Sequence, residues 1–146
     1  MYVNYNFTVE RSVEEVFNYF ANVENILEWA TFIRSERFTT DGGVQQGAEF
    51  KEDARIFGIP IKTTWTVTIY EPYERFVFHT NFYMATIDCT YQFESQNMHT
   101  HVSWEYRGEL HGLWKLITPI YERFMLSLRQ REFPNARRIL EARSST

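Results

Sequence analysis

Residues 48–56 read A-E-F-K-E-D-A-R-I, and every second side chain, from Glu49 to Arg55, is charged. Such alternation is typical of a half-buried β-strand, because successive side chains of a strand point to opposite faces of its sheet. The remaining positions are apolar except for Glu52. The pattern therefore predicts a strand with one carboxylate on the face that packs against the core.

Alternation of the same kind recurs on both sides of this stretch, and turn signals such as Asp41–Gly43 and Glu71-Pro72 separate the segments. Strands joined by short turns predict an antiparallel meander, because parallel neighbours need long crossover connections. The predicted strands are residues 2–9, Phe32–Thr39, Ala48–Phe57, Ile61–Tyr70, Arg75–Thr80, Met84–Phe93 and Met98–Gly108.

Helices are predicted at two places. Ser12 and Glu15 form a capping box at the start of a short helix, and a second short helix is expected over Glu24–Trp29. The residues from Leu113 to Arg143 predict a long helix that covers the sheet. We expect a kink or break at Pro134, because an interior proline removes a backbone hydrogen bond at a cost of about 3 kcal/mol. The apolar stripe of this helix consists of Leu113, Ile117, Ile120, Phe124 and Leu128.

The composition is that of a single soluble globular domain: 146 residues, 44% apolar and 23% charged. A net charge of −4 gives no general reason to bind nucleic acid or an anionic membrane. No stretch approaches the roughly 18 apolar residues of a membrane span, and no signal-peptide pattern opens the chain. We therefore expect a cytoplasmic protein without integral membrane association, and its oligomeric state stays open.

Arginines gather in the C-terminal region, where glutamates interrupt them. We interpret this segment as a solvated helix face. The residues are Arg123, Arg129, Arg131, Arg137, Arg138 and Arg143, with Glu122, Glu132 and Glu141 between them.

Motifs for metal or nucleophilic chemistry are weak. His99 and His101 share a strand face that Glu105 and Arg107 also occupy, so we interpret them as solvated and expect no metal site. The single cysteine, Cys89, excludes an intramolecular disulfide and has no adjacent basic residue, so we expect a small buried hydrophobe. Nucleophile elbows, phosphate-binding glycine loops and H-E-x-x-H helices do not occur, and we expect no cofactor.

Several longer stretches carry a resemblance. They are S-V-E-E-V-F-N-Y-F-A-N-V-E-N-I-L-E-W at 12–29, W-T-V-T-I-Y-E-P-Y-E-R-F-V-F at 65–78, G-L-W-K-L-I-T-P-I-Y-E-R-F at 112–124 and N-A-R-R-I-L-E at 135–141. With the order of predicted elements, they resemble the START-like (SRPBCC) superfamily, although Pro134 departs from its usual uninterrupted last helix. The resemblance implies one α+β domain over residues 1–146 with the helix-grip fold. In that fold a curved antiparallel sheet of about seven strands wraps around a long C-terminal helix, and two short helices follow the first strand.

The superfamily includes lipid and sterol carriers, aromatic polyketide cyclases and dehydratases, and quinone-binding proteins, so the resemblance also implies an internal cavity. Such a cavity needs mostly apolar walls and a few convergent polar groups. The candidate walls are Phe50, Trp65, Phe78, Ile87, Phe93, Val102 and Trp104, with Ile117, Ile120, Phe124 and Leu128 from the helix. The candidate polar groups are Glu52, Thr63, Cys89, Tyr91 and Tyr106.

Glu52 is the candidate catalytic residue. A carboxylate among apolar groups is costly when ionised and unpaired, so its pKa should rise into the range useful for general acid–base chemistry. There are two alternatives to a buried catalytic Glu52. A β-bulge could turn its side chain outward, or the residue could lie at the solvent-exposed entrance of the cavity.

Two functions stay open. One is a carrier or sensor that binds a small hydrophobic or amphipathic ligand, such as a lipid, isoprenoid, quinone or polyketide. The other is a cofactor-free polyketide cyclase or dehydratase, in which Glu52 transfers a proton and Tyr91 or Tyr106 polarises a carbonyl.

Overall fold

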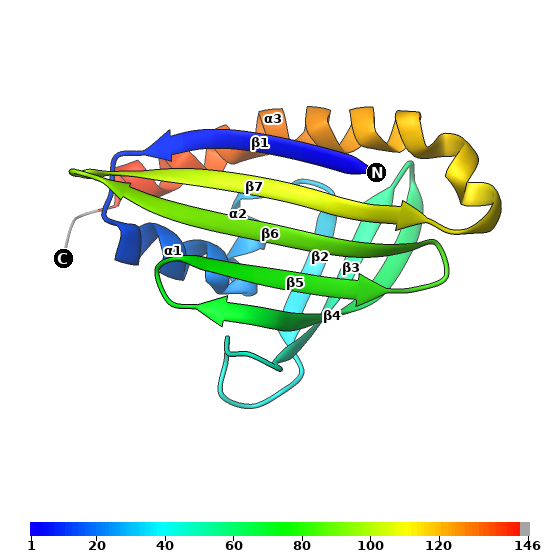
Figure 1. The fold of residues 1–146 in the computed structure, drawn as a ribbon, viewed down its shortest axis with the longest axis horizontal. Helices are drawn as coiled ribbons and strands as arrows, with labels where there is room; N and C mark the ends of the chain where they lie inside the picture. The colour runs from blue at the N-terminus through cyan, green and yellow to red at the C-terminus, as the bar shows by residue number, and fades with distance from the viewer. Residues whose placement is uncertain (144–146) are drawn as a thin grey trace.

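A seven-stranded sheet dominates the structure, a computed structural model that describes residues 1–143. The strands are antiparallel in the order β1-β7-β6-β5-β4-β3-β2, which confirms the predicted meander and adds β1 beside β7 (Figure 1). They are β1 (Tyr2–Val9), β2 (Ile33–Phe38), β3 (Glu49–Ile56), β4 (Ile59–Glu71), β5 (Arg75–Asn81), β6 (Ala85–Gln96) and β7 (His99–Leu110).

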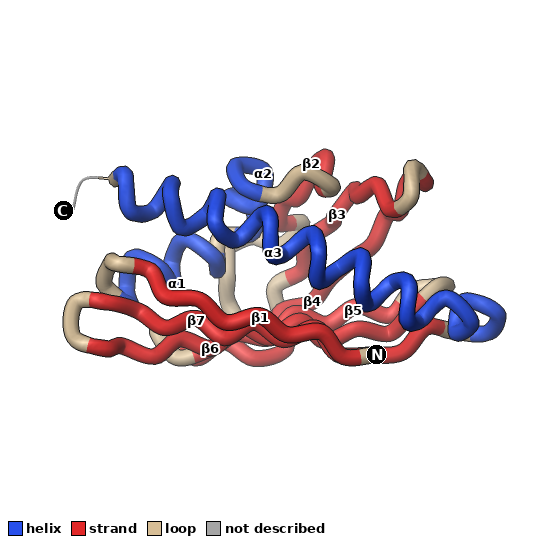
Figure 2. Tube along the Cα trace, turned by 90° about the horizontal axis from the view of Figure 1, so that it is seen from above, coloured by secondary structure: helices blue, strands red, loops and turns tan. Residues whose placement is uncertain are grey.

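The sheet curls around the long C-terminal helix. Figure 2 shows α3 (Thr118–Ala142) lying along the sheet, with β1, β6 and β7 on one side of it and β2 and β3 curling to the other. This is the helix-grip arrangement that the resemblance implied. Its consequence is a concave sheet face that looks toward a single helix.

The shorter helices lie near the two ends of α3 (Figure 1). Helix α1 (Val13–Ala21) starts at the predicted capping box, because the side chain of Ser12 accepts a hydrogen bond of 3.3 Å from the backbone N–H of Glu15. The second predicted helix is divided into a 3₁₀ turn, η1 (Val23–Asn25), and α2 (Ile26–Trp29). Another 3₁₀ segment, η2 (Gly112–Ile117), leads from β7 into α3. Within residues 1–143, no helix combines the length and apolar character that a bilayer crossing requires.

The predicted apolar stripe of the last helix is wrong by about one residue position. Leu113 and Ile120 are 85% and 58% exposed, whereas the face toward the sheet contains Arg129 and Glu132. One position on an α-helix is a rotation of about 100°, so apart from Leu128, which is buried, the residues of the predicted stripe pointed past the core. The buried residues of α3 are Tyr121, Met125, Leu128, Arg129, Glu132, Phe133, Ala136 and Leu140.

Helix α3 also continues through Pro134, so of the expected kink or break, the break is wrong. The backbone carbonyl that loses its N–H donor belongs to Gln130, four residues earlier. Both residues are exposed, and water at that surface can bond to the carbonyl in place of the missing donor.

Gly108 lies on β7 directly opposite Ile87 of β6. A Cβ atom at this position would come within 2.0 Å of the carbonyl oxygen of Thr86 and 2.9 Å of the Cα atom of Ile87. Both contacts are with the backbone of the neighbouring strand. Glycine is therefore required here by the close approach of two strands.

Candidate functional site

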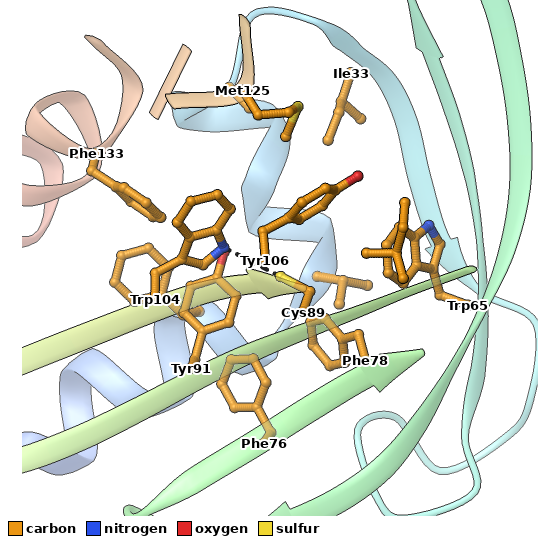
Figure 3. Packing of buried hydrophobic residues seen from close by; sticks show 14 of the residues in the cluster. Ile33, Trp65, Phe76, Phe78, Cys89, Tyr91, Trp104, Tyr106, Met125 and Phe133 are labelled. Atoms are coloured by element: carbon orange, nitrogen blue, oxygen red, sulfur yellow. Dashed lines mark hydrogen bonds between the residues drawn. The ribbon is translucent and has the colours of Figure 1, made fainter. Parts of the chain in front are cut away.

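A cavity of about 60 Å³ lies between the concave face of the sheet, α2 and α3. Figure 3 shows side chains of its sheet wall, including Tyr91 and Tyr106, facing Met125 of α3. The lining residues are Phe20, Val23, Ile26, Trp29, Phe32, Glu36, Phe50, Glu52, Ile56, Ile61, Thr63, Trp65, Phe78, Phe82, Ile87, Cys89, Tyr91, Tyr106, Tyr121, Met125 and Arg129.

The structure places the predicted site residues in two groups. Those on β3 to β6, with Tyr106 on β7, lie in the cavity wall, apart from Phe93. The helix residues do not, because the stripe chosen for α3 was rotated away from the cavity. Lining the cavity are Phe50, Glu52, Thr63, Trp65, Phe78, Ile87, Cys89, Tyr91 and Tyr106. Outside the lining are the core residues Phe93, Val102, Trp104 and Leu128, the half-buried Ile117 and Phe124, and the exposed Ile120.

Glu52 faces a second carboxyl group that the sequence analysis missed. The register of β2 and β3 sets Glu36 directly opposite Glu52, and both line the cavity. The alternation of apolar and polar residues in β2 did not predict Glu36 as a buried residue, because a register shift between Ile33 and Ser35 interrupts it. As a result Ile33 and Glu36, three residues apart, are both buried.

Burial raises the pKa of Glu36 well above its ordinary value, and the neighbouring charge of Glu52 raises it further. Burial also raises the pKa of Glu52, although the neighbouring Glu36 carboxyl, the Arg129 cation and the hydroxyl of Thr63, which lies 3.5 Å from Oε2 of Glu52, act in the opposite direction. Two buried carboxyl groups in directly opposed positions favour a proton on one of them, because two neighbouring negative charges repel each other. The pair therefore retains a proton to higher pH than an ordinary surface glutamate does.

Arg129 is the charged residue of α3 that enters the cavity wall, and it is only 4% exposed. This corrects the interpretation of all the C-terminal arginines as solvated. Its guanidinium carbon lies 5.2 Å from the ring centre of Trp29 and 5.1 Å from that of Trp104, within the range of cation–π attraction. Burial lowers the pKa of Arg129, but the neighbouring acidic groups together raise it more, so the residue remains a cation.

Glu132 holds α3 against the segment before β2. Its Oε2 atom accepts hydrogen bonds from the backbone N–H and the hydroxyl of Thr31, the latter at 2.9 Å. Its Oε1 atom lies 3.6 Å from Nη1 of Arg129. This carboxylate is a second correction to the solvated-face interpretation, because it is 1% exposed.

The remaining polar groups of the wall are neutral hydrogen-bonding groups. The hydroxyls of Tyr106 and Tyr121 are 2.8 Å apart, and burial raises the pKa of Tyr121 to about 12. The indole N–H of Trp104 donates to Sγ of Cys89 at 3.2 Å, and burial raises the pKa of that thiol to about 12 (Figure 3). A thiol with so high a pKa is a poor nucleophile at neutral pH.

A curved sheet that closes on one helix around an apolar cavity, with a few buried polar groups, has the general features of a small-molecule site. The chain belongs to the family described as polyketide cyclase / dehydrase and lipid transport, whose sequence model matches residues 3–131. None of the curated proteins matches the chain significantly in sequence.

Solved structures with the same fold include protein TTHA0849 from Thermus thermophilus, with a TM-score of 0.83 and 14% identity over 99% of this chain and 100% of that one. A START superfamily protein from Mycobacterium smegmatis has a TM-score of 0.80 and 11% identity, over 96% of this chain and 97% of that one. The Zhui aromatase/cyclase from a Streptomyces species has a TM-score of 0.72 and 12% identity, over 97% and 91% of the two chains. Identities this low show a shared fold alone.

Proposed function

We propose that the protein binds a small hydrophobic or amphipathic molecule in the cavity between the sheet and α3, as a carrier or sensor. The observation that carries this proposal is the combination of aromatic walls with buried polar groups that lack partners. Apolar walls supply affinity, and a few fixed polar groups orient the ligand. The family description, which includes lipid transport, supports the same class of ligand.

The cavity must widen when a ligand binds. Its 60 Å³ is well below the roughly 300–1,000 Å³ of pockets that enclose drug-sized molecules. Met125 lines it from α3, and methionine is the apolar side chain that adapts most readily to a new shape. We therefore expect ligand binding to rearrange the α3 wall rather than the strands.

Native mass spectrometry of the purified protein, followed by organic extraction, tests the proposal. A hydrophobic molecule that co-purifies with the protein supports the proposal if the Met125→Trp variant, in which the larger side chain fills the cavity, carries less of it. An exchange experiment with added lipid, quinone and aromatic ketone mixtures follows if the protein carries nothing. Failure of all three mixtures to give a bound mass contradicts the proposal.

The Glu36–Glu52 pair supports a second candidate, a cofactor-free cyclase or dehydratase. A protonated carboxyl beside an ionised one provides an acid and a base in one apolar site, as ring closure by aldol addition and loss of water require. Tyr91 or Tyr106 would then donate a hydrogen bond to the carbonyl oxygen.

The test uses heptane-2,6-dione, whose cyclisation with loss of water yields an enone that absorbs in the ultraviolet. Glu52→Gln should abolish turnover and change the affinity for the diketone only a few-fold. Equal losses of binding and rate, or no loss of rate, contradict a catalytic role of Glu52.

A further inference from the structure

Unpartnered polar atoms converge on the cavity. Among the described residues, Nε and Nη1 of Arg129 and Oε2 of Glu36 are buried and have no hydrogen-bond partner. Both residues line the cavity, at 4% and 5% exposure. Leaving a buried polar group unsatisfied is costly, and most such groups in folded proteins are paired. Free donors on one wall and a free oxygen on another indicate a place for a polar ligand.

The ion pair with Glu132 leaves the N–H groups of Arg129 without a hydrogen bond. Its nearest carboxylate atom, Oε1 of Glu132, is 3.6 Å away, too far for a hydrogen bond. The other oxygen of Glu132 is occupied by Thr31. Aromatic rings fix the guanidinium in place instead, since Trp29, Phe32, Trp104 and Phe133 all lie 5.1 to 5.5 Å from its carbon. The cation is therefore held in position while its N–H groups stay available.

The charges around the cavity select against an anion. Glu132 already offsets the positive charge of Arg129, and the Glu36–Glu52 pair adds further negative charge on the facing strands. A carboxylate ligand would meet like charge at close range in a medium of low dielectric constant. An uncharged oxygen acceptor, such as a carbonyl, uses the N–H groups of Arg129 without that repulsion.

We propose that the cavity recognises an uncharged, ring-sized molecule that carries both a carbonyl and a hydroxyl group. The carbonyl oxygen accepts hydrogen bonds from Arg129, and the hydroxyl donates to Oε2 of Glu36. This inference rests on the proposed ligand-binding function and specifies its ligand class. It assigns Arg129 and Glu36 as the residues that determine specificity, and the aromatic walls as the source of general apolar affinity.

The test measures binding of three matched sets of probes by isothermal titration calorimetry slightly below neutral pH. They are the 3- and 4-hydroxy isomers of acetophenone, the corresponding ethylphenols, which lack the carbonyl, and the corresponding hydroxybenzoates, which are anions. The wild type should bind a hydroxyacetophenone about 10- to 100-fold more tightly than its ethylphenol, the range expected for a hydrogen bond to a charged donor. The hydroxybenzoates should bind most weakly.

Arg129→Met should remove the preference for the ketone and leave the affinity for ethylphenol within about three-fold, since hydrophobic volume is preserved. Arg123→Met, at an exposed position of the same helix, is the matched control and should bind as the wild type does. If the single variant folds poorly, Glu132→Gln combined with Arg129→Met provides a variant without an unpaired carboxylate.

The outcomes separate this inference from the proposed function. A wild type that binds ethylphenols and ketones equally, or hydroxybenzoates best, overturns the inference and leaves hydrophobic binding intact. An unchanged ketone preference in Arg129→Met overturns the role of Arg129. Absence of binding for every probe, together with failure of the mass-spectrometric test, overturns both.

Discussion

Glu36 on β2 and Glu52 on β3 are directly opposite residues of an antiparallel pair, and their carboxyl groups share one apolar cavity. Two carboxyl groups so placed cannot both ionise without mutual repulsion, and burial penalises each charge. A site that would be unstable as two carboxylates is stable as a pair with a shared proton. The remaining charged group of the wall, Arg129, faces this pair from the helix.

The pair makes stability depend on pH. Because the pKa of Glu36 is raised well above its ordinary value of 4.5, the folded chain binds more protons than the unfolded chain between those two values. The free energy of unfolding therefore falls as the pH rises from about 4.5 through the raised pKa, with a slope of up to about 1.4 kcal/mol per pH unit for one proton.

Glu36→Gln should reduce that slope. Urea unfolding at a series of pH values, followed by tryptophan fluorescence, compares the variant with the wild type and with Glu49→Gln, an exposed position on β3. The advantage of Glu36→Gln over the wild type should grow with pH. A constant difference across the series would mean that Glu36 titrates as a surface group.

Removing Glu132 should destabilise the protein. Glu132→Ala deletes the acceptor of Thr31 and leaves Arg129 as a buried charge without a counter-ion. Breaking a buried pair in this way costs about 3–5 kcal/mol. Chemical denaturation measures the loss, and Gln130→Ala at an exposed position of α3 is the control. Adding Arg129→Met to Glu132→Ala should recover part of the lost stability. A double variant that is less stable than Glu132→Ala alone would argue against the ion pair.

Cys89 should be unreactive in the folded protein. Its thiol is buried, and its pKa of about 12 leaves little thiolate near neutral pH. Reaction with 5,5′-dithiobis(2-nitrobenzoate) should be at least about 100-fold slower in buffer than in urea, because each pKa unit changes the thiolate fraction about tenfold. Equal rates in the two solutions would show that reagents reach the cavity freely.

Gly108→Ala should weaken the sheet. The added methyl group would meet the carbonyl oxygen of Thr86 at 2.0 Å, and separating β6 from β7 is the only relief. Overpacking of this kind costs about 1–3 kcal/mol. Thermal unfolding should show a lower midpoint than both the wild type and Ser103→Ala, a substitution on the same strand. An unchanged midpoint would mean that the two strands separate easily at this point.

The sequence by itself determined the class of fold and the sheet wall of the cavity. Alternation along β3 and β4 is imposed by strand geometry, so the inward positions of Phe50, Glu52 and Trp65 follow from parity. The capping box at Ser12 is likewise a local interaction between residues close in the chain. Such features depend on neighbours that the sequence itself specifies.

Only the tertiary structure decided which polar residues share the cavity. The inward position of Glu36 depends on a register shift in β2. This shift arises from the pairing of β2 with β3 and not from the order of residues in β2 alone. The place of Arg129 in the cavity wall depends on how α3 is rotated about its own axis, and packing against the sheet sets that rotation. A search for apolar stripes misjudges the rotation when the buried face carries charged residues. Charged side chains are buried when distant residues compensate them. For Arg129 the distant residues are Trp29 on α2 and Trp104 on β7, and the carboxylate of Glu132, three residues further along α3, adds to them.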